Sequence, residues 1–232
     1  MGCERYLAMT AEEFAATTVP PAHMAWMACH FSPYGRGLCN LPRQLPEGSV
    51  LILNDRISWN AHDAALITRQ LSDAAIRQKA SAVLLDFENA DVAGIDSLIC
   101  KLKEALPCPL VVSKIYAPKE DIAVFLPPCP IHVPLQKYLL PWEGRPIWLE
   151  AAVQTEVITV TEKGSKSCVS GAYDMEECPH EDHSLHCCYR IEAKDNAAHF
   201  ILRRDRSHID ALQEEASALG VAAIVGLHQE LG

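Results

Sequence analysis

The stretch AVLLDFENAD (82–91) places two carboxyls, Asp86 and Glu88, two residues apart at the end of an apolar run. Side chains alternate along a strand, so these two share one face while Val83 and Leu85 take the other. Like charges held this close raise the pKa of one carboxyl, which can then act as an acid. We expect Glu88 to be that acid and Asp86 its partner. In the alternative, structural interpretation, Asp86 caps the following turn and Glu88 is solvated.

Further polar and aromatic side chains stand at or just after the ends of other apolar runs. In parallel α/β folds such ends converge on one rim, so we treat these residues as candidates for ligand binding. They are His30, Tyr34, Asn54, Asp55, Trp59, Tyr116, Glu150, His228 and Glu230. Trp59, in the polar turn ISWNAHD, is the better candidate for stacking on a sugar, whereas Trp148 is more typical of a core.

Short apolar runs alternate with helical patterns along the chain. The runs are continuous, which is typical of strands buried on both faces. We expect strands that end at Phe31, Asp55, Glu88, Tyr116, Pro128, Glu150 and His228. Helical spacing covers 62–79, 94–106 and 207–219, the last with Ser207 as N-cap and Gly220 after its end. This alternation predicts βα units with all strands parallel.

The pattern predicts a single α/β domain over residues 1–232, built as a TIM-like (β/α) barrel. Seven units are legible, so one is short, absent or unrecognised, and an open doubly wound sheet is the alternative. Residues 153–204 interrupt the alternation of strands and helices. They predict an antiparallel β-hairpin insert with a turn at 194–196. The polar segment 163–184 within it is expected to be an exposed loop.

The stretch AVLLDFE resembles the fourth strand of the chitinase-like glycoside hydrolases of family 18, whose motif is D-x-x-D-x-D-x-E. Aligned at its end, the catalytic acid of the motif falls on Glu88 and the preceding aspartate on Asp86. Leu84 and Ser81 stand where the motif has its two earlier acids.

The C-terminal residues 208–232 resemble the last helix and strand of the same barrel, with Leu227 and His228 near its usual tryptophan. In that family the substrate's acetamido oxygen attacks the anomeric carbon, the glutamate protonates the leaving oxygen and the aspartate orients the acetamido group. The resemblance therefore implies a glycoside hydrolase acting on N-acetylated or other glycosides, with Glu88 as acid and Asp86 as the orienting group.

Two other functions are compatible with the sequence. A non-catalytic carbohydrate-binding or scaffold protein on a barrel needs only the pocket and its aromatic residues. A metal-dependent hydrolase would use CPHEDHSLHCC (178–188) and Cys168, because zinc prefers thiolate and imidazole ligands. The spacing matches no standard zinc site, so we expect no metal and no cofactor. Cys29, Cys100, Cys108 and Cys129 lie in or beside apolar stretches, and we expect the cysteines to be reduced thiols.

Charge and missing motifs exclude several classes of protein. The net charge of −10 opposes binding to nucleic acid. No dinucleotide fingerprint, P-loop or serine-hydrolase elbow is present. The chain has no signal-peptide pattern and no apolar stretch of membrane-spanning length. We therefore expect a cytoplasmic protein with a small-molecule or oligosaccharide ligand and no nucleic-acid or membrane partner. No sequence feature indicates an oligomeric state.

Overall fold

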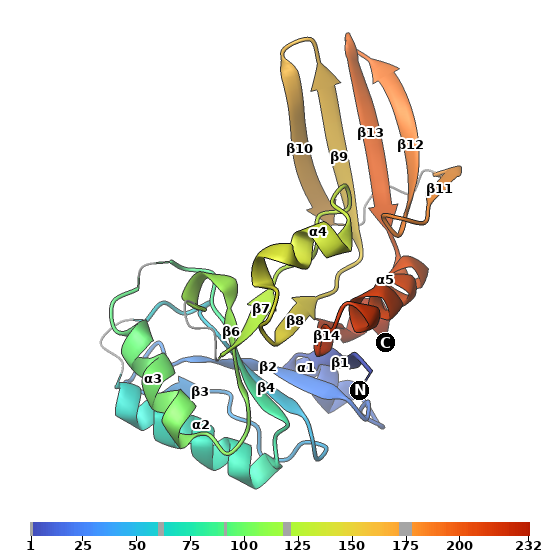
Figure 1. Ribbon diagram of the computed structural model, residues 1–232. Coiled ribbons are helices and arrows are strands. Elements are labelled where there is room, and N and C mark those ends of the chain that lie inside the picture. The colour runs from blue at the N-terminus through green and yellow to red at the C-terminus, as the bar shows by residue number, and fades with distance from the viewer. Residues whose placement is uncertain (1, 60–62, 91, 118–121, 172–177) are drawn as a thin grey trace.

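The computed structural model describes residues 2–59, 63–90, 92–117, 122–171 and 178–232, and their central element is a closed barrel of eight parallel strands (Figure 1). Around the barrel the strands are β1 (Glu4–Met9), β2 (Met24–Phe31), β4 (Val50–Asn54), β5 (Ala82–Asp86), β6 (Leu110–Ser113), β7 (Ala123–Leu126), β8 (Ile147–Glu150) and β14 (Ala223–Leu227). Since β1 pairs with both β2 and β14, the sheet has no open ends. The predicted barrel is confirmed, and the open sheet is excluded.

The barrel strand that the sequence pattern did not indicate is β1. It begins with two charged residues, Glu4 and Arg5, and is too short to form a clear apolar run. Tyr6 and Ala8 point into the barrel interior. Arg5 points outward, where its guanidinium pairs with Asp210 of α5 (Arg206–Ala218) at 2.6 Å. The alternation of inward and outward side chains is therefore present, but it is carried by few apolar residues.

Three helices match the predicted helical segments: α2 (Ala64–Gln78), α3 (Ile95–Ala105) and α5. His62, where the first was expected to begin, lies outside the described residues. Asp205, rather than Ser207, is the N-cap of α5, because its carboxylate accepts hydrogen bonds from the backbone N–H groups of Ser207 and His208. Gly220 follows the helix with φ of +82°, as expected for a glycine that ends a helix.

The other helices are short: α1 (Ala11–Ala16), α4 (Leu135–Leu139), α6 (His228–Leu231) and the 3-10 turns η1 (Lys114–Tyr116) and η2 (Leu140–Trp142). The β2–β4 connection has no helix and carries only β3 (Leu38–Cys39), and the described part of the β6–β7 connection has only η1. Strand β6 therefore ends at Ser113, three residues before the predicted end at Tyr116. No helix in the described part of the chain is long and apolar enough to span a membrane.

The barrel interior is filled by alternating large and small side chains. Trp148 stacks on Tyr6, with ring centroids 5.4 Å apart and planes 10° from parallel. Small residues leave room for these rings: Ala8, Ala25, Ala82, Ala123 and Ala223. Trp148 is thus a core residue. On the outside, α2 and α3 lie side by side against the strands (Figure 1), and Leu71 and Leu98 are buried there.

A second sheet stands off the barrel between β8 and α5 (Figure 1). Its strands, in spatial order, are β10 (Gly164–Gly171), β9 (Gln154–Thr161), β13 (Ala197–Arg204), β12 (Cys187–Lys194) and β11 (His180–Asp182). The sheet is antiparallel, as predicted, but larger than a hairpin. The segment expected to be a loop contributes β10 and β11. Asp195 and Asn196 have positive φ values of 54° and 57°, as a tight hairpin turn requires.

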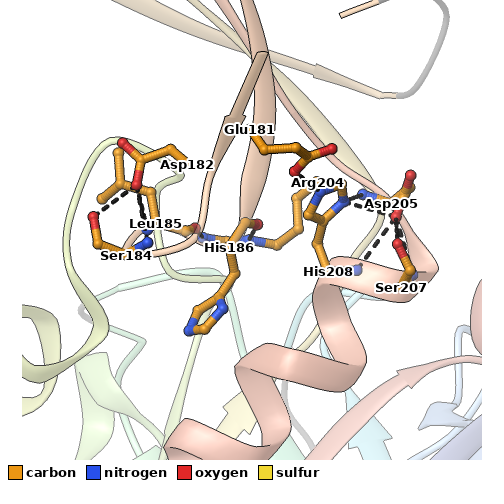
Figure 2. Close-up of polar contacts among 9 residues, drawn as sticks. All are labelled: Glu181, Asp182, Ser184, Leu185, His186, Arg204, Asp205, Ser207 and His208. Carbon is orange, nitrogen blue, oxygen red and sulfur yellow. Dashed lines mark hydrogen bonds and ion pairs between the residues drawn. The ribbon is translucent and has the colours of Figure 1, made fainter. Parts of the chain in front are cut away.

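The base of this insert is tied to the barrel by a buried arginine. Arg204 is only 2% exposed and donates hydrogen bonds to the carbonyl groups of Cys129 (2.8 Å), Leu185 (2.9 Å) and His186 (3.3 Å). Figure 2 shows its side chain reaching toward the β11–β12 turn. One side chain therefore joins the last strand of the insert to two loops.

Histidine–carboxylate pairs add to these contacts. The imidazole of His208 lies between the carboxylates of Asp205 (Nδ1, 2.7 Å) and Glu181 (Nε2, 3.0 Å), as Figure 2 shows. Buried Glu156 on β9 pairs with His132 at 2.6 Å. We call this group the insert junction: His132, Glu156, Glu181, Arg204, Asp205 and His208.

Candidate functional site

A cavity of about 350 Å³ opens at the carboxyl ends of the barrel strands. We call it the mouth cavity. Its polar lining residues are Asn54, Asp55, Arg56, Ser58, Asp86, Glu88, Asn89 and Glu150. Its apolar lining residues are Ala8, Met27, Ile52, Phe125, Val225, Gly226 and Leu227. A small hollow with apolar walls and a few converging polar groups is typical of a small-ligand site.

The mouth carboxyls are positioned by the alternation of side chains along their strands. Asp86 is the last residue of β5, two residues after Leu84, which lies in the barrel interior. Glu150 is the last residue of β8, two residues after interior Trp148. Both carboxyls therefore point inward. Glu88 lies two residues beyond β5 and is exposed at the rim.

Asp55 shapes the rim from the neighbouring strand end. Its carboxylate accepts hydrogen bonds from the backbone N–H groups of Glu88 (3.1 Å) and Asn89 (2.9 Å) and from the Asn89 side chain (2.8 Å). Asn54, one residue earlier, donates from its side-chain amide to the carbonyl of Met27 at 3.0 Å. The bonds to Asp55 fix the loop that carries Glu88.

Burial disfavours the ionised form of two of these carboxyls. It raises the pKa of Asp86 to about 6, the charges of Glu88 and Asp55 add to this, and Arg56 opposes it. Burial also raises the pKa of Glu150 to about 7, with further contributions from Asp86, Glu88 and Glu230. We expected repulsion to act on Glu88, but the carboxyls with raised pKa values are the half-buried Asp86 and Glu150.

The same carboxyls line a second hollow of about 250 Å³. Asp86, Glu88, Phe125 and Glu150 belong to both cavities. The second hollow is also lined by residues at or just after the ends of β6 and β7: Ser113, Lys114, Ile115 and Pro127. The carboxyls therefore form a wall between two adjoining spaces.

Trp59 and Tyr116 line a neighbouring cavity of about 260 Å³, which shares Asp55, Ser58 and Asn89 with the mouth cavity. Tyr116 is buried, and its hydroxyl donates to the carbonyl of Asn89 at 2.6 Å. Trp59 packs edge to face on Phe31, with ring centroids 5.3 Å apart. Both aromatic residues therefore lie in the cavity next to the rim and do not line the mouth cavity itself.

Four other sequence candidates do not line the mouth cavity: His30, Tyr34, His228 and Glu230. The ring of His30 lies 3.2 Å from the side-chain amide of Asn40. Tyr34 is 98% exposed in the loop after β2. Glu230 accepts a hydrogen bond from the backbone N–H of Val153 at 3.0 Å, which ties α6 to the start of the insert.

Several lining residues were not among the sequence candidates. Arg56 is the one cation among the residues that line the mouth cavity, and Asn89 follows Glu88 on the same loop. Inward-facing Met27, Ile52 and Phe125 form part of the apolar wall. Counting back in steps of two from each polar strand end would have identified Ile52, because it precedes Asn54.

The Cys/His segment does not form a metal centre in the described structure. Among the described residues, no group of three or more His, Cys, Asp or Glu side chains could hold an ion. His186 pairs with Glu215 of α5, and the ring of His180 lies against Tyr189. Cys187 is buried. All ten cysteines lie within the described residues, and none is in a disulfide.

No protein-family model matches the chain, and no curated protein matches its sequence. Solved structures do share its fold. The Bacillus cereus spore cortex-lytic enzyme SleL aligns with a TM-score of 0.60 at 12% identity, over 100% of this chain and 72% of that chain. The C-terminal domain of a "putative chitinase" from Desulfitobacterium hafniense DCB-2 aligns with 0.57 at 10% identity, over 100% and 95%. At this identity the likeness establishes a common fold.

Proposed function

We propose that this protein is a glycoside hydrolase that binds a glycoside or oligosaccharide at the mouth cavity and cleaves it by carboxylate acid catalysis. Glu88 is the proposed acid, and Asp86 orients the substrate. One observation carries the proposal: Asp86, Glu88 and Glu150 line a single cavity at the carboxyl end of the barrel. Within the described residues, these three carboxylates form no hydrogen bond or ion pair.

Unpaired carboxyls that converge on a cavity favour a catalytic role over a structural one. A buried carboxylate without a partner destabilises the folded state, so its retention needs a reason outside folding. The named activities of proteins with the same fold, a cortex-lytic enzyme and a putative chitinase, agree with carbohydrate as the ligand. The resemblance of AVLLDFE to the family 18 motif assigns roles to Glu88 and Asp86 individually.

In the proposed reaction Glu88 gives its proton to the glycosidic oxygen as the bond from that oxygen to the anomeric carbon breaks. On an N-acetylated sugar the acetamido oxygen forms a bond to the same carbon, and Asp86 holds the acetamido group in place. Water then attacks the anomeric carbon and returns a proton to Glu88. Every proton released is recovered, so the cycle needs no cofactor.

The test is hydrolysis of aryl glycosides, N-acetylglucosaminides first and other sugars next. Glu88→Gln keeps size and polarity but removes the transferable proton, so kcat/KM should fall by about 10²–10⁴-fold. Asp86→Asn should also lower kcat/KM. Glu104→Gln and Asp73→Asn are matched controls, because both residues are exposed on helices outside the barrel, and they should leave the rate unchanged.

Two results would contradict the proposal in different ways. Hydrolysis that persists in Glu88→Gln would remove that residue from the mechanism. If the wild-type protein binds oligosaccharides but cleaves none of them, the site is a carbohydrate-binding site without catalysis.

A further inference from the structure

Three large apolar side chains are exposed on the insert: Val160 (40% exposed), Val169 (54%) and Ile191 (55%). Residues that pair directly across antiparallel strands point to the same face of the sheet. Ile191 pairs with Phe200, and Phe200 pairs with Ile158, so these three share a face. Steps of two along each strand place the other exposed residues on the same face. We call this surface the apolar face of the insert: Ile158, Val160, Val169, Tyr189, Ile191 and Phe200.

The rest of the protein covers only the base of this face. Near the barrel, Leu202 and Cys187 are buried against Ile131, which follows β7. Farther out, the strands extend past the barrel toward the turns at 162–163 and 195–196, and no second layer covers them in the described part of the chain (Figure 1). Because a sheet with an apolar face is normally covered by a second layer, the outer part of this face lacks a partner.

The outer part of the apolar face is also uncharged. One cross-strand row consists of Ser167, Ile158, Phe200 and Ile191, and the next consists of Ser165, Val160, Ala198 and Ala193. The charged side chains of these strand segments point to the opposite face: Lys166, Arg190, Glu192 and Lys194. The nearest carboxylate on the apolar side, that of Glu156, is only 1% exposed and pairs with His132.

A partner for this face must itself be flat, apolar and uncharged, because it would bury side chains that offer no ion pair. On a chain of net charge −10 such a surface is uncommon, and the same face of a second copy has all three properties. Two identical faces can meet about a two-fold axis, since such a contact is complementary to itself.

We propose that the insert is a dimerisation element whose apolar face packs on the same face of a second copy. Four strands of eight residues cover about 26 Å by about 19 Å, so each copy contributes at most about 500 Å². The two faces together bury at most about 1,000 Å², the lower limit for a specific interface, and the dimer is therefore reversible. This inference does not depend on the proposed function of the mouth cavity.

The test is sedimentation velocity of the full chain over a wide range of protein concentration. The wild type should pass from monomer to dimer as concentration rises. This should occur at lower concentration in high salt, because salt screens the repulsion between two chains of net charge −10. Ile191→Lys places a charge in each half of the interface and should weaken dimerisation at least about tenfold. Ile76→Lys is the matched control: Ile76 is 62% exposed on α2, and dimerisation should not change.

A wild type that stays monomeric at every concentration would overturn the proposal, as would equal dimerisation of Ile191→Lys and Ile76→Lys. Methyl NMR gives a measurement that needs no variant. The signals of Ile158 and Ile191 should shift as protein concentration rises, whereas that of Ile76 should not. If they shift instead when an oligosaccharide is added to the monomer, the face binds carbohydrate and the dimer is contradicted. A wild type that dimerises but cleaves no glycoside would contradict the proposed function alone.

Discussion

The mouth of the barrel and the insert junction both contain carboxylates, but these carboxylates differ in whether they have partners. At the junction each carboxylate has a partner: Asp205 and Glu181 bond to His208, and Glu156 bonds to His132. Hydrogen bonds from Ser207 and His208 outweigh burial and lower the pKa of Asp205. At the mouth, burial raises the pKa of Asp86 and Glu150. The charge of Arg56 opposes this only partly at Asp86, and neither carboxyl forms a hydrogen bond or ion pair within the described residues.

The difference separates charges that hold the fold together from carboxyls that we propose to bind a ligand. At the junction, Asp205 stabilises the folded state when ionised, because folding provides its hydrogen bonds. The inner mouth carboxyls destabilise the folded state when ionised, because folding removes water and supplies no partner in exchange. A polar ligand in the cavity would provide those missing partners. The following predictions test this contrast, from the largest expected effect to the smallest.

Arg204→Met should produce the largest loss of stability. Three carbonyl groups would lose their donor in a buried site, and removing one member of a buried polar network typically costs about 3–5 kcal/mol. Urea denaturation should report this loss, whereas Arg77→Met, at an exposed position on α2, should change stability little. If the two variants are equally stable, Arg204 does not hold the insert.

Glu150→Gln should have the opposite effect and stabilise the protein at high pH. The folded-state pKa of about 7 lies above the usual 4.5, so ionisation disfavours folding above pH 7 and has no effect below about pH 4.5. Removing the carboxyl should raise the free energy of unfolding at pH 8 by about 1–3 kcal/mol. Denaturation at pH 8 and pH 5 should show a smaller difference between variant and wild type at pH 5. A variant that is less stable than the wild type at pH 8 would contradict the proposed difference between the mouth and the junction.

Asp205→Ala should cost about 1 kcal/mol at pH 7, the usual value of a helix N-cap. The pKa of Asp205 is lowered in the folded state, so its stabilisation is present above its unfolded pKa and is lost as pH falls through the folded one. The difference between wild type and variant should therefore shrink as pH falls below the usual carboxyl pKa of 3.8. A cost that is independent of pH would assign the effect to helix propensity.

Apolar periodicity predicts most of the barrel because its strands are buried on both faces. It misses β1, whose charged first residues include Arg5, a side chain that faces α5 rather than a second apolar layer. It also misses β10, because GSKSCVSG is polar and the strand is held by backbone pairing to β9. A strand held mainly by backbone pairing has no apolar pattern from which a sequence could predict it.

The strand-end rule locates the site but does not select its members. Asn54, Asp55, Asp86, Glu88 and Glu150 all line the mouth cavity, at or just after the ends of their strands. The rule cannot identify side chains that bond elsewhere, such as Glu230 with Val153. It also does not indicate burial, which depends on neighbours from distant strands. Burial is what distinguishes Glu150 from Glu88.

The most direct test of the central claim, that the mouth carboxyls serve a ligand, is a map of where sugar binds. Backbone NMR signals would be followed while an N-acetylglucosamine oligosaccharide is added. We expect shifts at Asp86, Glu88, Asn89 and Glu150, with the insert-junction signals of Glu181 and His208 unchanged. Shifts confined to the junction, or none with any sugar of the panel, would contradict the claim.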